Sequence, residues 1–137
     1  MKVNYPPKIL LAWAEAIGGN KKIRDFLMQN GYQELALFVH AVYNQDEARS
    51  WLMKNGYPHL MAMINGAEGN QEAVKWLFNS GYKPLAYAAI AGDGFKDGLL
   101  WLEQNGHKEL ARVAKKIFIV KEQIELDNND THRISPE

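Results

Sequence analysis

Apolar residues recur along most of the chain with the spacing of short amphipathic helices. In the stretch "NQEAVKWLFNSGY", Ala73, Trp76 and Leu77 stand at i, i+3 and i+4 among polar residues, which is typical of a helix buried along one stripe. The next stretch, "KPLAYAAIAG", places Leu85 and Ala88 at helical spacing as well. No segment alternates apolar and polar residues for long, so the sequence predicts an all-α protein.

This pair of helices repeats at a constant interval of 25 residues. The interval is visible in one glycine column and three apolar columns: Gly31, Gly56, Gly81, Gly106; Phe26, Trp51, Trp76, Trp101; Leu27, Leu52, Leu77, Leu102; and Leu35, Leu60, Leu85, Leu110. Such a period indicates stacked repeats that bury their apolar faces only against neighbours. We predict about nine short helices with loops of about two to four residues, arranged as a short right-handed α-α superhelix, or solenoid, of about four and a half helical hairpins.

The glycine column marks the end of each first helix. It belongs to the phrases "NGYQEL", "NGYPHL", "SGYKPL" and "NGHKEL". Because glycine lacks a Cβ atom, it readily adopts the left-handed conformation that closes a helix. Pro58 and Pro84 follow near the start of the second helix, where the missing amide hydrogen of proline does no harm. The phrase therefore predicts a helix stop followed at once by a helix start.

Parts of the repeat resemble the ankyrin repeat. The residues that match its first helix are Pro84, Leu85, Ala88, Ala89 and Gly92, and those that match its second helix are Gly69, Val74, Leu77 and Gly81. Ankyrin repeats are about 33 residues long and carry a β-hairpin finger, whereas only two residues separate Gly81 from Pro84 here. The resemblance implies an ankyrin-like helical hairpin without the finger, and a role in binding other proteins.

The chain is expected to form one domain. Its 137 residues, with 47% hydrophobic and 23% charged residues, are ordinary for a single soluble domain. We predict a helical-repeat domain over residues 1–126, with the last helix running on through "KKIFIVKEQIEL" as a cap over the end of the stack. Residues 127–137, "DNNDTHRISPE", are polar and are predicted to form a disordered tail.

Charge and cysteine content exclude several classes of protein. Sixteen Lys and Arg residues balance sixteen Asp and Glu residues, so no overall field attracts nucleic acid or an anionic membrane. With no cysteine there is no disulfide, thiolate nucleophile or cysteine-ligated metal. The early apolar run is interrupted by Glu15 and is not predicted to be a signal peptide. No apolar stretch approaches the roughly 20 residues of a membrane-spanning helix, and we expect a cytoplasmic protein.

No recognisable catalytic or metal-binding pattern stands out. The four histidines, His40, His59, His107 and His132, form no H-x-x-x-H pair. The stretch "GDGFKDG" lacks the glutamate that a calcium-binding loop needs at its twelfth position. We predict no enzymatic activity, no cofactor and no metal site.

The tryptophan column has two interpretations. Trp51, Trp76 and Trp101 lie next to an unbroken leucine column, and aromatic residues at helical spacing are typical of a core. Exposed aromatic rings can instead form a platform on which bases or sugars stack. We favour the core.

The positions at which the repeats differ point to a surface. Two and five residues after the last leucine column stand Leu37, Ala62, Tyr87 and Arg112, and His40, Asn65, Ile90 and Lys115. They should project from one side of the row of second helices, where several are apolar for exposed positions. We predict a non-enzymatic adaptor or regulatory module that binds a partner along this row. The predicted contact residues are Leu37, His40, Asn65, Tyr87, Ile90 and Arg112.

Three alternatives stay open. The same positions can pack against the neighbouring repeat, since short helices bury much of their circumference. The partner can be a second copy of the chain. The last helix carries Arg112, Lys115 and Lys116 among glutamates, and helical repeats can bind RNA, although the neutral total charge disfavours nucleic acid.

Overall fold

The computed structural model describes residues 4–133, and all regular structure in this range is α-helix. The nine helices are α1 (Pro7–Ile17), α2 (Lys21–Gln29), α3 (Gln33–Val42), α4 (Asp46–Lys54), α5 (Pro58–Ala67), α6 (Gln71–Asn79), α7 (Lys83–Gly92), α8 (Lys96–Gln104) and α9 (Lys108–Arg133). Three residues join each helix to the next. The all-α class, the number of helices and the loop lengths predicted from the sequence are confirmed for this range.

The glycine column closes four helices in the predicted way. Gly31, Gly56, Gly81 and Gly106 have φ angles of 89°, 88°, 86° and 81°, in the left-handed region that glycine tolerates. The next backbone amide then reaches back over the last turn, as from Tyr82 N to Leu77 O at 2.8 Å. The same bond recurs in the other three turns, and it satisfies a carbonyl that the helix end would leave open.

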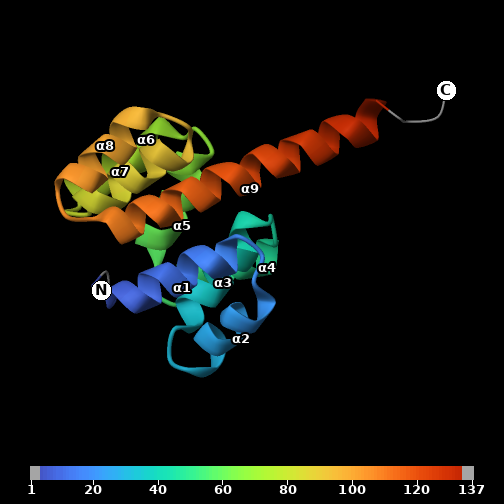
Figure 1. Ribbon diagram of the computed structural model, residues 1–137, viewed down its shortest axis with the longest axis horizontal. Coiled ribbons are helices and arrows are strands. Elements are labelled where there is room, and N and C mark those ends of the chain that lie inside the picture. Colours follow the sequence, from blue (N-terminus) through green and yellow to red (C-terminus); the bar gives the residue numbers. More distant parts are fainter. Residues whose placement is uncertain (1–3, 134–137) are drawn as a thin grey trace.

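The helices divide into an inner and an outer set (Figure 1). The inner helices are α1, α3, α5, α7 and α9, and the outer helices are α2, α4, α6 and α8. Contacts join α1 to α3, α3 to α5, α5 to α7, α7 to α9 and α9 back to α1. Each outer helix packs on the inner helices before and after it in the chain. The inner helices therefore form a closed cycle of contacts.

The last helix differs from the prediction in two ways. It was expected to cover the end of an open stack, but α9 packs against α1, because each of these helices carries an apolar face that no further repeat covers. It also continues to Arg133, past the expected boundary at residue 126. The segment after that boundary contains no glycine or proline up to Arg133 that would end the helix. Residues 134–137 of the predicted tail lie outside the described range.

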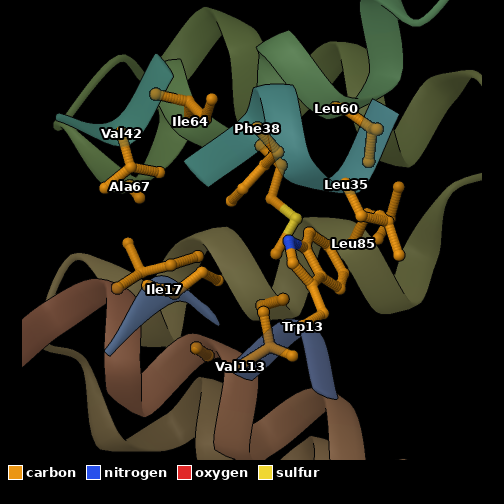
Figure 2. Packing of buried hydrophobic residues seen from close by; sticks show 14 of the residues in the cluster. Trp13, Ile17, Leu35, Phe38, Val42, Leu60, Ile64, Ala67, Leu85 and Val113 are labelled. Carbon is orange, nitrogen blue, oxygen red and sulfur yellow. The ribbon is translucent and has the colours of Figure 1, made fainter. Parts of the chain in front are cut away.

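The core lies between the inner helices (Figure 2). Trp13 of α1 is 1% exposed, and its ring meets the edge of the Phe38 ring with centroids 4.8 Å apart. Buried side chains from all five inner helices complete the cluster: Ile17, Leu35, Leu60, Ile64, Leu85, Val113 and Ile117. A core shared by five helices explains how helices of about ten residues, which are marginal alone, are stable here.

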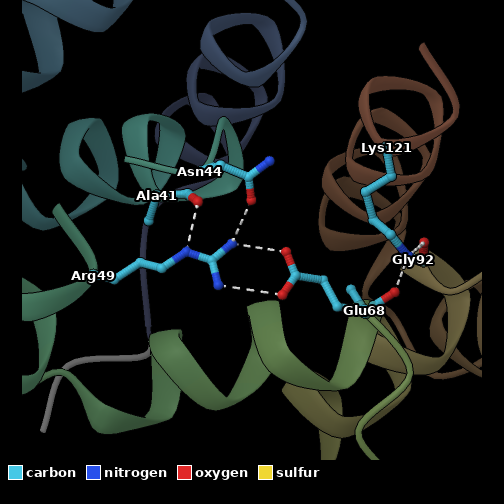
Figure 3. Close-up of polar contacts among 7 residues, drawn as sticks. Ala41, Asn44, Arg49, Glu68, Gly92 and Lys121 are labelled. Carbon is cyan, nitrogen blue, oxygen red and sulfur yellow. Dashed lines mark hydrogen bonds and ion pairs between the residues drawn. The ribbon is translucent and has the colours of Figure 1, made fainter. Parts of the chain in front are cut away.

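Positively charged side chains donate hydrogen bonds to backbone carbonyl groups at the carboxyl-terminal ends of three inner helices (Figure 3). Arg49 donates from Nε to the carbonyl oxygen of Ala41 at 3.1 Å and forms a two-point pair with Glu68 at 3.2 and 2.7 Å. Lys121 Nζ donates to the carbonyl oxygen of Ala67 and lies 3.4 Å from that of Gly92. Positive charge is favourable at these negative ends of the helix dipoles.

The aromatic column is not the core that the sequence suggested. Leu77 and its equivalents are fully buried, but Phe26 and Trp76 are 47% and 41% exposed, and Trp51 and Trp101 are half-buried. Successive helical residues differ in direction by about 100°, so a column next to the leucines lies at the edge of the buried stripe. The core interpretation is wrong for Phe26 and Trp76.

Each tryptophan instead stacks on the aromatic residue six positions later. The ring centroids of Trp51 and Tyr57, of Trp76 and Tyr82, and of Trp101 and His107 are 5.8, 5.9 and 5.7 Å apart. The protein's own ring thus covers one face of each indole, which reduces the surface available to a base or sugar.

Replacing Trp76 by alanine is expected to lower the free energy of unfolding by about 1 to 2 kcal/mol, because the side chain is only partly removed from water. Leu77→Ala is the matched control on the same helix, and it should cost about 2 to 5 kcal/mol. Urea denaturation of both variants measures the difference. An equal or larger loss for Trp76→Ala would contradict the edge position of the tryptophan.

Candidate functional site

The six predicted contact residues lie on four inner helices. Leu37 and His40 are on α3, Asn65 is on α5, Tyr87 and Ile90 are on α7, and Arg112 is on α9. Only Arg112 is exposed, and the other five are half-buried. Tyr87, for example, contacts aromatic rings of the outer helices α6 and α8.

Two of the predicted residues serve packing. Tyr87 stacks on Trp101 of α8 with ring centroids 4.3 Å apart and meets Phe78 of α6 edge-on at 5.2 Å. Leu37 packs against the buried core. The alternative that these positions pack against the neighbouring repeat is confirmed for Tyr87, whose partner Trp101 belongs to the next repeat.

His40 lies close to charges on α2. Its partial burial is the main reason that its pKa lies below the usual value, and the positive charge of Arg24 acts in the same direction, whereas Asp25 opposes it. The side chain is therefore neutral at pH 7, and it offers a polar contact rather than a positive charge.

Ile90 lines an apolar groove of about 350 Å³ on the outer surface. Val74 and Phe78 of α6 and Phe95, which precedes α8, line the groove as well. Phe78 and Phe95 are 37% and 60% exposed. Lys75, Asp93, Gln71 and Asn70 also line this groove. The result is an apolar surface with polar neighbours.

The groove is specific to one repeat. At the positions that correspond to Val74, Phe78, Ile90 and Phe95, the other repeats carry Arg24, Met28, His40, Gln45; Arg49, Met53, Asn65, Asn70; and Leu99, Glu103, Lys115, Val120. Each of those sets contains a charged side chain, and three of the four charges form ion pairs within the protein. Arg49 pairs with Glu68, and Lys115 lies 3.7 Å from Glu103. Only the set around Ile90 is entirely apolar.

Of the four apolar side chains in this groove, the sequence predicted only Ile90 as a contact residue. Val74 and Phe78 belong to the outer helix and Phe95 to a turn, whereas the prediction considered only variable positions of the inner helices. A comparison of all four columns at the interval of 25 residues would have found them, because no other repeat is apolar at all four.

A second pocket, of about 270 Å³, lies where inner helices begin. Leu10, Leu60, Leu85 and Leu110 contribute to its lining together with Tyr5, Tyr82, His107 and Glu109. Tyr5 donates a hydrogen bond at 2.6 Å to Glu34, which is 4% exposed. Burial, followed by this bond to Glu34, raises the pKa of Tyr5 above its usual range, so the phenol stays neutral. The arrangement offers apolar contact beside a few polar side chains.

The basic residues of α9 are largely paired with carboxylates. Lys115 lies 3.7 Å from Glu103, and Lys121 lies 3.6 Å from Asp93. Lys116 is 4.0 Å from Glu15. These pairs reduce the positive potential that binding to RNA would require.

Among the described side chains, no group of three or more His, Asp or Glu residues is placed to hold a metal ion; His132 lies outside these side chains. None of the helices within residues 4–133 combines the length and apolarity needed to cross a membrane.

Known proteins give no further guide to the groove. Comparison of the chain with protein-family models, with curated proteins and with solved structures found no match. The resemblance to ankyrin repeats accordingly stays a prediction from the sequence.

Proposed function

We propose that the protein is a soluble, cytoplasmic, non-enzymatic interaction module that binds another protein through the groove between α6, α7 and α8. The right-handed superhelical path of ankyrin-like hairpins without the finger is part of the same proposal. The observation that carries it is the all-apolar set Val74, Phe78, Ile90 and Phe95 in a single repeat.

Exposure of the two phenylalanines supports this role. Scattered apolar residues are normal on a protein surface, but a contiguous apolar patch beside polar residues is typical of an interaction site. Phe95 is 60% exposed and Phe78 is 37% exposed, and both line the groove together with the half-buried Ile90. A partner that inserts one aliphatic or aromatic side chain would remove these surfaces from water together, which is how central anchors contribute most of the binding energy.

The six residues predicted from the sequence take different roles in this proposal. Ile90 forms the floor of the groove, and Tyr87 supports Phe78 from the side. Leu37, His40, Asn65 and Arg112 would contact a partner only if it extended from the groove along the remaining repeats.

The test compares two lysine substitutions at matched positions. Phe78→Lys places a charge in the groove. Met53→Lys places a charge at the equivalent position of the preceding repeat, outside the groove, where the side chain of Met53 is 57% exposed. A partner recovered with the wild-type protein and then purified should bind Phe78→Lys with a dissociation constant at least about ten-fold higher, since a charge in an apolar contact is costly. Met53→Lys should bind as the wild type does.

Calorimetric titration of the purified partner measures the three affinities, and circular dichroism checks that both variants keep the helical content of the wild type. Equal affinity of Phe78→Lys and the wild type would rule out the groove as the site. An equal loss for Met53→Lys would show that lysine on the outer helices disturbs binding without regard to the groove.

A further inference from the structure

The second half of α9 extends beyond the body of the protein. Lys121 already contacts the last carbonyl groups of α5 and α7, so the residues after it continue past the ends of those helices (Figures 1 and 3). Among the described side chains of this extension, Ile124 still packs against the core. A helical segment of about a dozen residues is marginal in water without tertiary packing. The extension therefore needs packing against another surface to be stable as a helix.

One stripe of α9 faces away from the core over the whole length of the helix. Its exposed members stand four, three, four, three and four residues apart: Lys108, Arg112, Lys115, Ile119, Glu122 and Leu126. Ile119 and Leu126 are 58% and 52% exposed, whereas Val113, Ile117 and Val120 on the other side are buried. This spacing is that of a helix face that can pack against a second helix.

Charge is sorted along this stripe. The first half carries Lys108, Arg112 and Lys115, and the second half carries Glu122, with Glu125 and Asp127 beside it. Two such stripes side by side in opposite directions place each basic half against an acidic half. In the same direction they would place like charges together, which is unfavourable.

Two exposed leucines flank the basic half. Leu11 lies one turn before Glu15 on α1, and Glu15 pairs with Lys116. Leu100 lies almost one turn before Glu103 on α8, and Glu103 pairs with Lys115. Residues one turn apart share a helix face, so both leucines, 40% and 51% exposed, lie toward α9. The body therefore offers a strip in which Arg112 and Lys115, the second of them 3.7 Å from Glu103, lie between two apolar side chains.

We propose that two copies of the chain associate through antiparallel α9 helices, with the extension of each copy lying on the strip formed by Leu11, Arg112, Lys115 and Leu100 of the other. The occupant is a second copy because the acidic and apolar residues that fit this strip, Glu122, Glu125 and Leu126, stand on the chain's own extension. This surface is separate from the groove at Ile90, and the inference does not depend on the proposed function.

The pairing has a definite register. With Ile119 of one copy near Phe118 of the second, Lys115 comes opposite Glu122 and Arg112 opposite Glu125. Leu126 then lies over the aliphatic stems of Lys108 and Arg112, which can cover apolar surface while their charges stay in water. Each contact occurs twice about a two-fold axis, as in most homodimers.

Charge reversal in two separate variants tests the inference. One variant combines Arg112→Glu with Lys115→Glu, and the other combines Glu122→Lys with Glu125→Lys. Each variant alone then carries like charges at positions 112, 115, 122 and 125, which face one another in the pair, so its dissociation constant for self-association should rise at least about ten-fold over that of the wild type. An equimolar mixture should form a one-to-one heterodimer, because the opposite charges meet again.

Sedimentation equilibrium of the full-length chains measures these constants, and circular dichroism checks the fold of each variant. A control variant with Glu47→Lys and Lys54→Glu, both on the exposed side of α4, should dimerise as the wild type does. Phe78→Lys should dimerise normally too, which separates this surface from the groove. A wild-type chain that is monomeric at all concentrations, or reversed variants that dimerise unchanged, would overturn the proposal, and so would a mixture that fails to associate.

Discussion

Replacing Trp13 by alanine is expected to lower the free energy of unfolding by about 3 to 5 kcal/mol, the largest loss for any one side chain of the protein. Trp13 is 1% exposed and packs edge-on against Phe38 at 4.8 Å. It belongs to the core shared by the inner helices, so its removal leaves a cavity within this core. Urea denaturation followed by far-ultraviolet circular dichroism measures the loss.

Two comparisons make this result interpretable. Trp13 Nε1 is buried without a hydrogen-bond partner among the described residues, so Trp13→Phe loses volume but also removes an unsatisfied donor. It should cost only about 1 to 2 kcal/mol. Trp76→Ala removes the same atoms from a side chain that is 41% exposed. If Trp13→Ala were no more damaging than Trp76→Ala, the central position of Trp13 would be wrong.

The parts of the fold that the sequence predicted well depend on local rules. Gly31 and its equivalents close helices because only glycine adopts positive φ at little cost. The leucine columns are buried because a spacing of three and four residues places them on one helix face. Both rules act within a few residues, and the constant interval of 25 residues repeats them four times.

The closed cycle of inner helices could not be predicted in the same way. The contact between α1 and α9 joins segments about a hundred residues apart in the chain, and the columns that bury an open stack are the same as those that bury a closed one. The partial exposure of Trp76 was not predicted for a related reason. Periodicity indicates which residues share a face, but not how wide the buried stripe is.

The candidate site was found only in part. Ile90 was predicted because it differs from the polar residues at the same position in other repeats. Phe78 and Phe95 were missed because the groove forms where α6 and the start of α8 lie over α7, and no single helix shows that arrangement. Tyr87 has the same variable character as Ile90, yet its ring is held between Phe78 and Trp101.

Replacing Gly98 by alanine is expected to destabilise the protein by about 2 to 3 kcal/mol. In an ordinary helix interior this change stabilises by roughly 0.5 to 1 kcal/mol, because alanine loses less backbone entropy than glycine. At Gly98 of α8, however, an added Cβ would lie 2.6 Å from the carbonyl oxygen of Tyr87 and 2.7 Å from the amide nitrogen of Ala91. Both atoms belong to the backbone of α7, so no side chain can rotate away, and the two helices must separate.

The equivalent positions supply the control. Ala73 and Ala48 stand 25 and 50 residues before Gly98, so the other hairpins accept a methyl group where α7 and α8 do not. Ala73→Gly should therefore lose only about 0.5 to 1 kcal/mol, through backbone entropy. Urea denaturation compares the two variants, and tryptophan fluorescence reports the contact of Tyr87 with Trp101 beside the crossing. A neutral or stabilising Gly98→Ala would show that α7 and α8 cross at a greater distance, because only their close approach reverses the ordinary preference for alanine.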